Sequence, residues 1–360
     1  MKVAHVLSTL TPGGAEILTL DFAKNIGSGI NLSILYFGDG ELFDEFKETK
    51  LKLIKIKKDV FFFELIFKIR RILLQEEIQI LHIHSVTNPI PFILATFFTK
   101  IKIVITVHGY SLGKNKLLTR YFSGKVSRFL YVSESLKFDT LKTTCWQNDE
   151  KQKVHYNGID PNKFIYPRYK FRYMFDNQDS SILMGMVGNF NTGRNQLKVC
   201  QALRKIVDKH ISFKFVFVGA AQNHELYSEC FLFCKENKLM DNIIFAGSRT
   251  DIPEFLSSLD LFVYASNHDT FGIAVVEAMM SGTAVIVNDL DVFKEITNDG
   301  KYACLYKSGD ENDLYEKIIY YIQNQKEREL LGEKGKEWAM NNFSIERYIK
   351  NLQLIYDDLI

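Results

Sequence analysis

The chain has 360 residues, of which 46% are hydrophobic and 24% charged, so we expect a globular protein of two domains and exclude a disordered or fibrous one. No apolar run is as long as a transmembrane span, and the start MKVAHVLS does not have the pattern of a secretory signal peptide. The five cysteines have neither metal-ligand nor disulfide spacing, which favours the reducing cytoplasm.

The net charge of +2 is unevenly distributed along the chain. Residues 1–165 carry 23 Lys and Arg against 16 Asp and Glu, a net charge of +7, whereas the remaining residues have a net charge of −5. This asymmetry indicates that the first half faces something anionic.

Short apolar runs alternate with helical patterns along almost the whole chain. Such alternation predicts an α/β fold with parallel sheets, and the two halves share this architecture. The predicted strands are Val3–Leu7, Leu32–Phe37, Ile78–His84, Lys102–His108 and Phe129–Ser133 in the first half, and Ile182–Val187, Phe213–Val218, Asn242–Phe245, Leu261–Ala265 and Thr283–Asn288 in the second.

A linker is predicted in residues 154–167, VHYNGIDPNKFIYP, because they are rich in Gly, Asn and Pro and have no regular period. We therefore expect one domain over residues 1–165 and another over 166–340, with a separate helical segment over 341–360. The expected helices at the end of the chain are Leu314–Gln323, Glu327–Ala339 and the amphipathic Ile345–Leu359.

Residues 260–288 predict a βαβ unit whose helix begins near Gly272 and ends near Gly282. Glu277 is the only charge inside this helix, and a carboxylate buried there without a partner would cost several kcal/mol. Solvent or a lysine is the ordinary partner of such a residue, and a bound ligand is the alternative. Asp269 favours the ligand, because it precedes the helix at the carboxyl end of a strand, where α/β sheets bind ligands.

Two other glycine motifs follow predicted strands in the first half. Gly13 and Gly14 would let the backbone approach a phosphate or sugar at a helix N-terminus, although a simple tight turn explains them equally well. His108, in VHG, stands at the tip of its strand, where it either faces a ligand or only caps a loop.

The segment VGNFNTGRNQ, residues 187–196, predicts a strand, a polar loop and the start of a helix. Arg194 near a helix N-terminus is unfavourable with the helix dipole unless an anion lies there, so this arginine indicates a phosphate ligand. Asn189 and Asn195 could add neutral donors.

Asp289 and Asp291 form a DxD sequence, which can hold a metal ion bound to a nucleotide sugar. An acidic loop produces this pattern by chance, so we predict neither a metal ion nor another cofactor.

Residues 60–74, VFFFELIFKIRRILL, combine a wide apolar face with cations, and nine further basic residues against two acidic ones lie between Lys100 and Lys142. These features predict either an interfacial helix on an anionic membrane or a helix packed on its sheet with solvated cations. The nine basic residues are Lys100, Lys102, Lys114, Lys116, Arg120, Lys125, Arg128, Lys137 and Lys142.

Taken in order, the motifs resemble family four of the retaining GT-B glycosyltransferases, which use nucleotide-sugar donors. The resemblance covers essentially the whole chain, through GG, VHG, YVSES, NGID, GNFNTGRNQ and DTFGIAVVEAM. Each motif alone is weak, but their order and spacing are specific. The resemblance implies two Rossmann-like domains facing across a cleft, with the C-terminal helix crossing back to the N-terminal domain.

The resemblance also implies roles for single residues. Glu277 would hold the donor ribose, and Arg194 would bind the diphosphate, with Asn189 in place of the arginine that usually precedes it. Asp269 stands where the family usually has Glu, and His108 would contact the transferred sugar. The implied catalytic residues are His108, Arg194 and Asp269, and the implied donor-binding residues are Gly13, Gly14, Asn189, Arg194, Phe271, Gly272, Ile273 and Glu277.

We therefore expect a retaining, metal-independent transfer of a sugar, with a UDP-sugar favoured as donor, to a hydroxyl of a glycan or lipid-linked glycan during bacterial surface polysaccharide synthesis. The expected location is the cytoplasm, with peripheral binding of the basic half to the inner membrane face, and no nucleic-acid partner is expected. Two alternatives remain at this stage: a sugar-nucleotide epimerase of similar architecture and a catalytically silent nucleotide-sugar-binding subunit.

Overall fold

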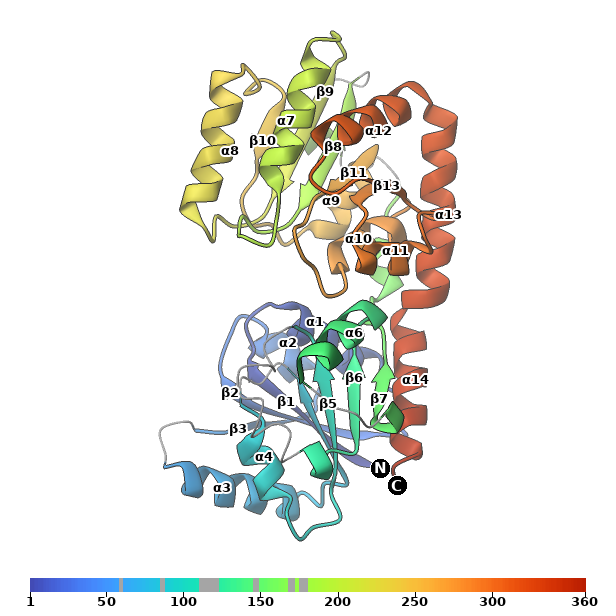
Figure 1. Cartoon of the computed structure of the whole chain (residues 1–360). Coiled ribbons are helices and arrows are strands. Elements are labelled where there is room, and N and C mark those ends of the chain that lie inside the picture. Colours follow the sequence, from blue (N-terminus) through green and yellow to red (C-terminus); the bar gives the residue numbers. More distant parts are fainter. Residues whose placement is uncertain (58–60, 85–87, 110–122, 145–148, 168–171, 175–180) are drawn as a thin grey trace. The chain divides into compact units, whose positions relative to one another are not determined.

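The computed structural model describes residues 1–57, 61–84, 88–109, 123–144, 149–167, 172–174 and 181–360 (Figure 1). The chain divides into two compact units, one of Met1–Asp160 with Ile345–Ile360 and the other of Pro161–Ser344. Each unit has a parallel sheet with helices between its strands, which confirms the predicted α/β fold class.

The first unit contains a seven-stranded sheet in the order β3-β2-β1-β4-β5-β6-β7, and neighbouring strands are parallel. The strand order reverses between β1 and β4, which makes the carboxyl ends of these two strands a topological switch point. The strands are β1 (Lys2–Thr9), β2 (Asn31–Gly38), β3 (Lys52–Lys55), β4 (Ile80–His84), β5 (Lys102–Val107), β6 (Arg128–Tyr131) and β7 (Gln152–Val154).

The helices of the first unit connect these strands. Leu18 and Phe22 of α1 are buried in the same core as Ile34 of β2 and Ile80 of β4. The described α-helices between the strands are α1 (Gly14–Asn25), α2 (Phe43–Glu48), α3 (Phe62–Gln75), α4 (Ile90–Ala95) and α6 (Glu134–Thr144).

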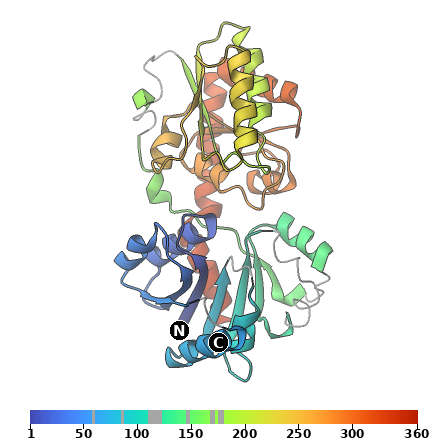
Figure 2. The same cartoon turned by 90° about the vertical axis from the view of Figure 1, so that its left-hand side faces the viewer.

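The last helix, α14 (Ile345–Asp357), completes the core of this first unit. Ile345, Tyr348, Leu352 and Tyr356 recur at helical spacing and are buried there. Gly158 permits the close approach of α14, because a Cβ at this position would lie 2.5 Å from Cβ of Tyr348. This return confirms the predicted C-terminal crossing, and both chain termini accordingly lie in the first unit (Figure 2).

The second unit contains a six-stranded parallel sheet in the order β10-β9-β8-β11-β12-β13. Its order reverses between β8 and β11, and the residues of β11 and β12 are buried throughout, as expected for central parallel strands covered on both faces. The strands are β8 (Ile182–Val187), β9 (Phe213–Val218), β10 (Ile243–Phe245), β11 (Leu261–Tyr264), β12 (Ala284–Asn288) and β13 (Cys304–Tyr306).

The α-helices of the second unit follow its strands and continue into the C-terminal helices. Gly272 precedes α10 and Ser281 follows it, close to the predicted limits of this helix. The helices are α7 (Gln196–Val207), α8 (His224–Glu236), α9 (Ile252–Ser258), α10 (Ile273–Met280), α11 (Asp291–Thr297), α12 (Glu311–Gln323) and α13 (Gln325–Phe343).

Three strands were missing from the sequence prediction, namely β3, β7 and β13. All three are short and lie at the edge of a sheet, where few alternating residues are available to produce a pattern. Among the residues that the structure describes, no helix is both long enough and apolar enough to cross a membrane.

Candidate functional site

The loops that follow β8 and β11 meet at the switch point of the second sheet. Arg194 and Ser266 form an isolated antiparallel bridge. Asn195 N donates to Ala265 O at 3.1 Å, and Asn267 N donates to Gly193 O at 3.0 Å. These backbone bonds bring together two loops that the sequence analysis identified separately.

Arg194 lies in the middle of this junction. Its Nη2 lies 3.3 Å from Oδ2 of Asp269, and its Nη1 donates to Ser266 Oγ at 3.1 Å. The guanidinium carbon lies 5.2 Å from the centre of the Tyr264 ring, while the buried Nε has no hydrogen-bond partner among the described residues. Gly188 leaves room for this side chain, since a Cβ there would lie 3.3 Å from Nε. The structure therefore holds a cation at the switch point.

The carboxylate of Asp269 is held from several sides. Its Oδ1 accepts hydrogen bonds from the backbone N–H of Thr270 at 2.8 Å and of Gly272 at 3.1 Å. Its Oδ2 accepts one from the Tyr264 hydroxyl at 3.1 Å, in addition to the contact with Arg194. Burial and the negative charge of Asp269 raise the pKa of Tyr264 well above its usual value, so this hydroxyl remains a donor.

The start of α10 depends on a glycine. Gly272 has a left-handed backbone with φ of 84°, and a Cβ there would lie 2.7 Å from Cε1 of Phe293. The backbone N–H groups of Phe271 and Gly272, which the family resemblance assigns to the donor, point at Oδ1 of Asp269, at 3.4 and 3.1 Å. Ile273 is the first residue of the helix. Glu277 lies one turn further along, half-buried between the buried residues Val276 and Ala278.

Asn189 has a structural contact that the sequence did not reveal. Its Oδ1 accepts a hydrogen bond from Ala220 N at 2.8 Å, and its backbone oxygen accepts one from Gln196 Nε2 at 3.2 Å. The side chain thus joins the loop after β8 to the loop after β9.

The two carboxylates of the DxD sequence point to different partners. Oδ1 of Asp289 accepts hydrogen bonds from the N–H of Ser308 at 2.8 Å and from its hydroxyl at 2.7 Å. Asp291 opens α11 and is largely exposed, with Oδ1 3.7 Å from Nζ of Lys294. Asp289 therefore serves to anchor the loop around Ser308.

In the first unit, the glycine pair and His108 lie at the carboxyl ends of their strands. Gly13 precedes α1 with an extended backbone, and Gly14 is its exposed first residue. His108 follows β5 directly, and its Nε2 lies 3.1 Å from Nδ1 of His84. Burial lowers the pKa of His108 to about 4, so its imidazole is neutral at physiological pH.

The sequence analysis missed the residues that surround His108. His84, His82 and His5 are buried and hydrogen-bonded to one another or to Tyr356. The sequence HIH in β4 places two histidines on the same face of a strand, which was a signal for such a cluster.

The surface of α3 combines exposed aromatic residues with cations. Phe63 is 73% and Phe67 70% exposed, while only Ile69 and Leu73 of this helix are buried. Arg70 is used internally, because its Nη1 donates to Phe97 O at 2.6 Å. Of the residues named for this region in the sequence analysis, Val60, Lys114, Lys116 and Arg120 lie outside the described residues.

Two family models match the chain. The model of Glycosyltransferase Family 4 matches residues 12–163, and the model of Glycosyl transferases group 1 matches residues 170–338. Together they span most of both units.

Known proteins of similar length match as well. The O-antigen biosynthesis glycosyltransferase WclY of Escherichia coli is 24% identical over 371 residues, covering 100% of this chain and 99% of WclY. The UDP-Gal:alpha-D-GlcNAc-diphosphoundecaprenol alpha-1,3-galactosyltransferase of Escherichia coli is 21% identical, covering 100% and 97%.

The same fold occurs in solved structures. The crystal structure of Anabaena Alr3699/HepE in complex with UDP and glucose matches with a TM-score of 0.86 and 18% identity, over 99% of each chain. With the two family models and the parallel-sheet architecture, these matches show that the chain belongs to the family-four glycosyltransferases of GT-B fold, as its motifs predicted.

Proposed function

We propose that this glycosyltransferase transfers a sugar from a UDP-sugar, with retention of configuration, to a hydroxyl of a glycan or lipid-linked glycan in bacterial surface polysaccharide synthesis. The observation that carries the proposal is the position of Arg194 beside the N-terminus of α10, at the switch point between β8 and β11. A guanidinium and a helix N-terminus both attract a diphosphate, and sheets of this kind bind ligands at this point.

The relatives support the choice of donor and acceptor. The name of one relative gives UDP-Gal as donor and alpha-D-GlcNAc-diphosphoundecaprenol as acceptor, and another relative is named for O-antigen biosynthesis. A solved structure of the same fold is a complex with UDP and glucose. On this basis, we propose that the enzyme works at the cytoplasmic face of the membrane, where its acceptor would be anchored. The family does not favour the epimerase or the silent subunit.

In the proposed reaction, the bond between the sugar C1 and the donor phosphate breaks through an oxocarbenium-like state. The acceptor oxygen forms the new bond to C1 on the same face, and its proton passes to the leaving phosphate oxygen. Arg194 stabilises the charge that grows on the diphosphate, and Glu277 holds the ribose hydroxyls. Neither a protein nucleophile nor a metal ion is required, because positioning and charge stabilisation supply most of the rate.

The contacts of Asp269 argue against the rival mechanism, in which this carboxylate attacks the sugar. Five hydrogen-bond or ionic contacts already engage its two oxygens, from the N–H groups of Thr270, Phe271 and Gly272, the Tyr264 hydroxyl and Arg194. Such contacts stabilise the carboxylate and make it a weaker nucleophile. We therefore propose that Asp269 orients Arg194 and the start of α10, and an aspartyl-sugar adduct in a mass spectrum would contradict this role.

The proposal is tested first by donor binding. Thermal unfolding of the full chain with UDP-, GDP- and ADP-sugars should show stabilisation by a UDP-sugar, about 2.7 kcal/mol when the ligand is present at a hundred times its Kd. Glu277→Gln should weaken that stabilisation, because it removes charged hydrogen bonds worth about 1.5–3 kcal/mol each. Glu316→Gln, at an exposed position of α12, is the matched control.

Transfer itself is then measured with a lipid-linked glycan acceptor, and the configuration of the product is determined by NMR. Product that retains the donor configuration and forms only with acceptor present supports the proposal. An altered sugar released without acceptor would indicate an epimerase, and binding without any turnover would indicate a silent subunit.

A further inference from the structure

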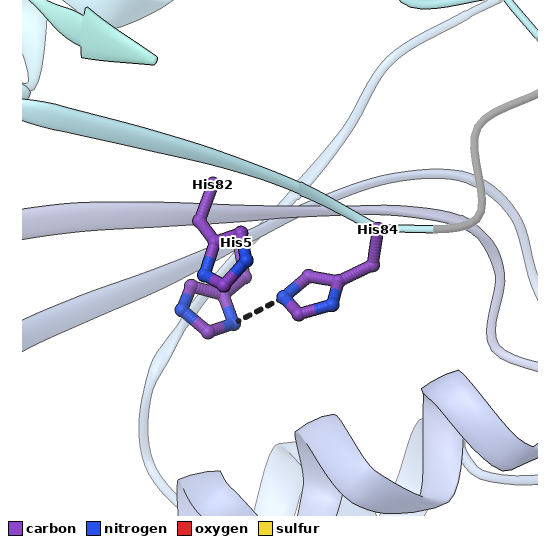
Figure 3. A group of neighbouring side chains, drawn as sticks. All are labelled: His5, His82 and His84. Atoms are coloured by element: carbon purple, nitrogen blue, oxygen red, sulfur yellow. Dashed lines mark hydrogen bonds between the residues drawn. The ribbon is translucent and has the colours of Figure 1, made fainter. Parts of the chain in front are cut away.

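Six side chains of the first unit, five of them buried and one, His108, half-buried, form one continuous chain of hydrogen bonds, which we call the histidine chain. It consists of His108, His84, His5, Tyr356, His82 and Thr106, in this order. The heavy-atom distances along it are 3.1, 3.1, 2.9, 2.5 and 2.7 Å. Figure 3 shows His5, His82 and His84 gathered together, with the bond between His5 and His84 dashed.

The sheet brings these residues together. His5 of β1 is opposite His82 of β4, and His84 is opposite Thr106 of β5. Successive residues of a strand alternate between faces, so residues two apart in β4 project to the same face. Tyr356 reaches this face from α14, and its hydroxyl lies between Nε2 of His5 and Nδ1 of His82.

The order of atoms along the chain links the tautomers of its members. In each of His5, His82 and His84, one ring nitrogen bonds to the preceding group and the other to the following group. A neutral imidazole has one donor and one acceptor nitrogen. The direction of the hydrogen bond at one nitrogen of each ring therefore fixes the direction at the other nitrogen. Two arrangements give every bond one hydrogen: either all four histidines carry it on Nε2 or all four carry it on Nδ1.

Thr106 selects between these arrangements. If the histidines carried hydrogen on Nε2, Thr106 would accept from His82, and its own buried hydroxyl hydrogen would have no acceptor that the described contacts provide. If they carry hydrogen on Nδ1, Thr106 donates to His82 and Tyr356 donates to His5. Leaving a buried donor unsatisfied costs about 1–3 kcal/mol. His108, at the other end, is only half-buried, so its Nδ1–H does not carry this cost and the second arrangement is favoured.

We propose that the histidine chain makes Tyr356 a positioning residue, which fixes His108 in the neutral tautomer with its hydrogen on Nδ1 and its Nε2 bonded to His84. His108 is the residue that the family resemblance assigns to the transferred sugar, and only its part in turnover rests on the proposed function. An imidazole held in one tautomer presents one defined donor nitrogen. In functional histidines generally, the hydrogen bond at one ring nitrogen determines which nitrogen carries the hydrogen.

A metal ion is the other chemistry that this cluster suggests. His5, His82 and His84 offer ligand atoms within 4.8 Å of one another. Both ring nitrogens of each are already bonded within the chain, and the cluster contains no carboxylate or thiolate to balance a dication in the core. A buried charge without such a partner is expensive, so the hydrogen-bonded chain explains the cluster better.

The first test is nitrogen NMR of the full chain labelled on histidine, which distinguishes the two tautomers and needs neither substrate nor turnover. The expected result is the Nδ1–H tautomer at His5, His82, His84 and His108. Hydrogen on Nε2 of His108, a mixed set among the four, or bound metal at these nitrogens would overturn the proposal.

The second test compares two tyrosines of α14. Tyr356→Phe removes the hydroxyl from the chain, so His108 should become a mixture of tautomers. The kcat should fall about ten-fold, by analogy with the lower end of the cost of removing an outer partner from a metal-binding histidine, while KM for the donor changes little. Tyr348→Phe removes a hydroxyl from the same buried helix face outside the chain and is the control.

The two readouts separate the proposals. If Tyr356→Phe leaves the tautomer of His108 unchanged, the positioning role is wrong whatever the activity. If the tautomer of His108 changes but the wild-type protein transfers no sugar, the positioning role of Tyr356 is correct and the proposed function is wrong. Should Tyr356→Phe not fold, the tautomers of the wild-type chain still decide.

Discussion

Arg194 and Asp269 form an ion pair, with Nη2 and Oδ2 3.3 Å apart, between the loops that follow β8 and β11. The pair joins the cation proposed to bind the donor diphosphate to the carboxylate that bonds the start of α10. The guanidinium is therefore already oriented before a donor phosphate binds. Such preorganisation is the condition for strong electrostatic stabilisation.

Arg194→Ala should lower kcat by about 10²–10³ with a smaller rise in KM for the donor, because charge on the leaving phosphate grows in the transition state. Arg194→Lys should recover part of the rate, because lysine keeps the positive charge. The recovery should be incomplete, because an ammonium group cannot make the bidentate contact of a guanidinium. Steady-state kinetics check both, with Arg204→Ala on the outer part of α7 as the control. A near-normal kcat for Arg194→Ala would mean that another cation binds the diphosphate.

Activity should survive EDTA, because the proposed mechanism stabilises the diphosphate with Arg194 and α10. Asp289→Ala should instead lower stability, by about 0.5–1.5 kcal/mol, since it removes the acceptor of two hydrogen bonds from the exposed Ser308. Asp291→Ala, at the exposed end of the same sequence, should have little effect on the urea midpoint. Loss of turnover on chelation, restored by Mn²⁺, would contradict the metal-independent mechanism.

The exposed aromatic face of α3 should bind anionic vesicles. Phe63→Ser with Phe67→Ser should reduce binding, because these exposed rings lie beside the cations of a unit with net positive charge. Binding of the wild type should also weaken in salt, since exposed charges are screened beyond about 8 Å at physiological ionic strength. Vesicle sedimentation measures both effects, with the exposed Leu232 of α8 changed to Ser as the control. Equal binding to neutral and anionic vesicles would exclude an electrostatic contribution to membrane binding.

Acid should destabilise the first unit. Burial lowers the pKa of His5 to about 3 and that of His155 to about 4, and it lowers the pKa values of His82 and His84 well below their usual 6.5. Below pH 6.5 the unfolded chain takes up protons that the folded chain does not, so stability is lost as the pH falls from about 6.5 toward the folded values. Each such histidine contributes a slope of about 1.4 kcal/mol per pH unit in that window.

Hydrogen exchange between pH 7 and pH 5 measures this loss separately in the two units. The loss of amide protection should be largest in β1, β4 and α14, which contain His5, His82, His84 and Tyr356. An unchanged first unit at pH 5 would show that these histidines take up protons in the folded state.

The sequence alone was sufficient to predict the parallel sheets, the βαβ unit around α10 and the family. These features depend on residues close together in the chain. Examples are the apolar runs of β8 and β11 and the glycine at position 272, where the backbone is left-handed. The motifs of the family are likewise local, so their order can be read directly.

Only the tertiary structure decided which of these residues meet. Tyr356 and His5 are 351 positions apart, and Arg194 and Ser266 are 72 apart, so their contacts depend on strand order and on the return of α14. The carboxamide of Asn189 could have faced a ligand, and its bond to Ala220 follows from the pairing of β8 with β9. Local periodicity determines which face a side chain occupies, but the partner across that face is set by the packing of the whole unit.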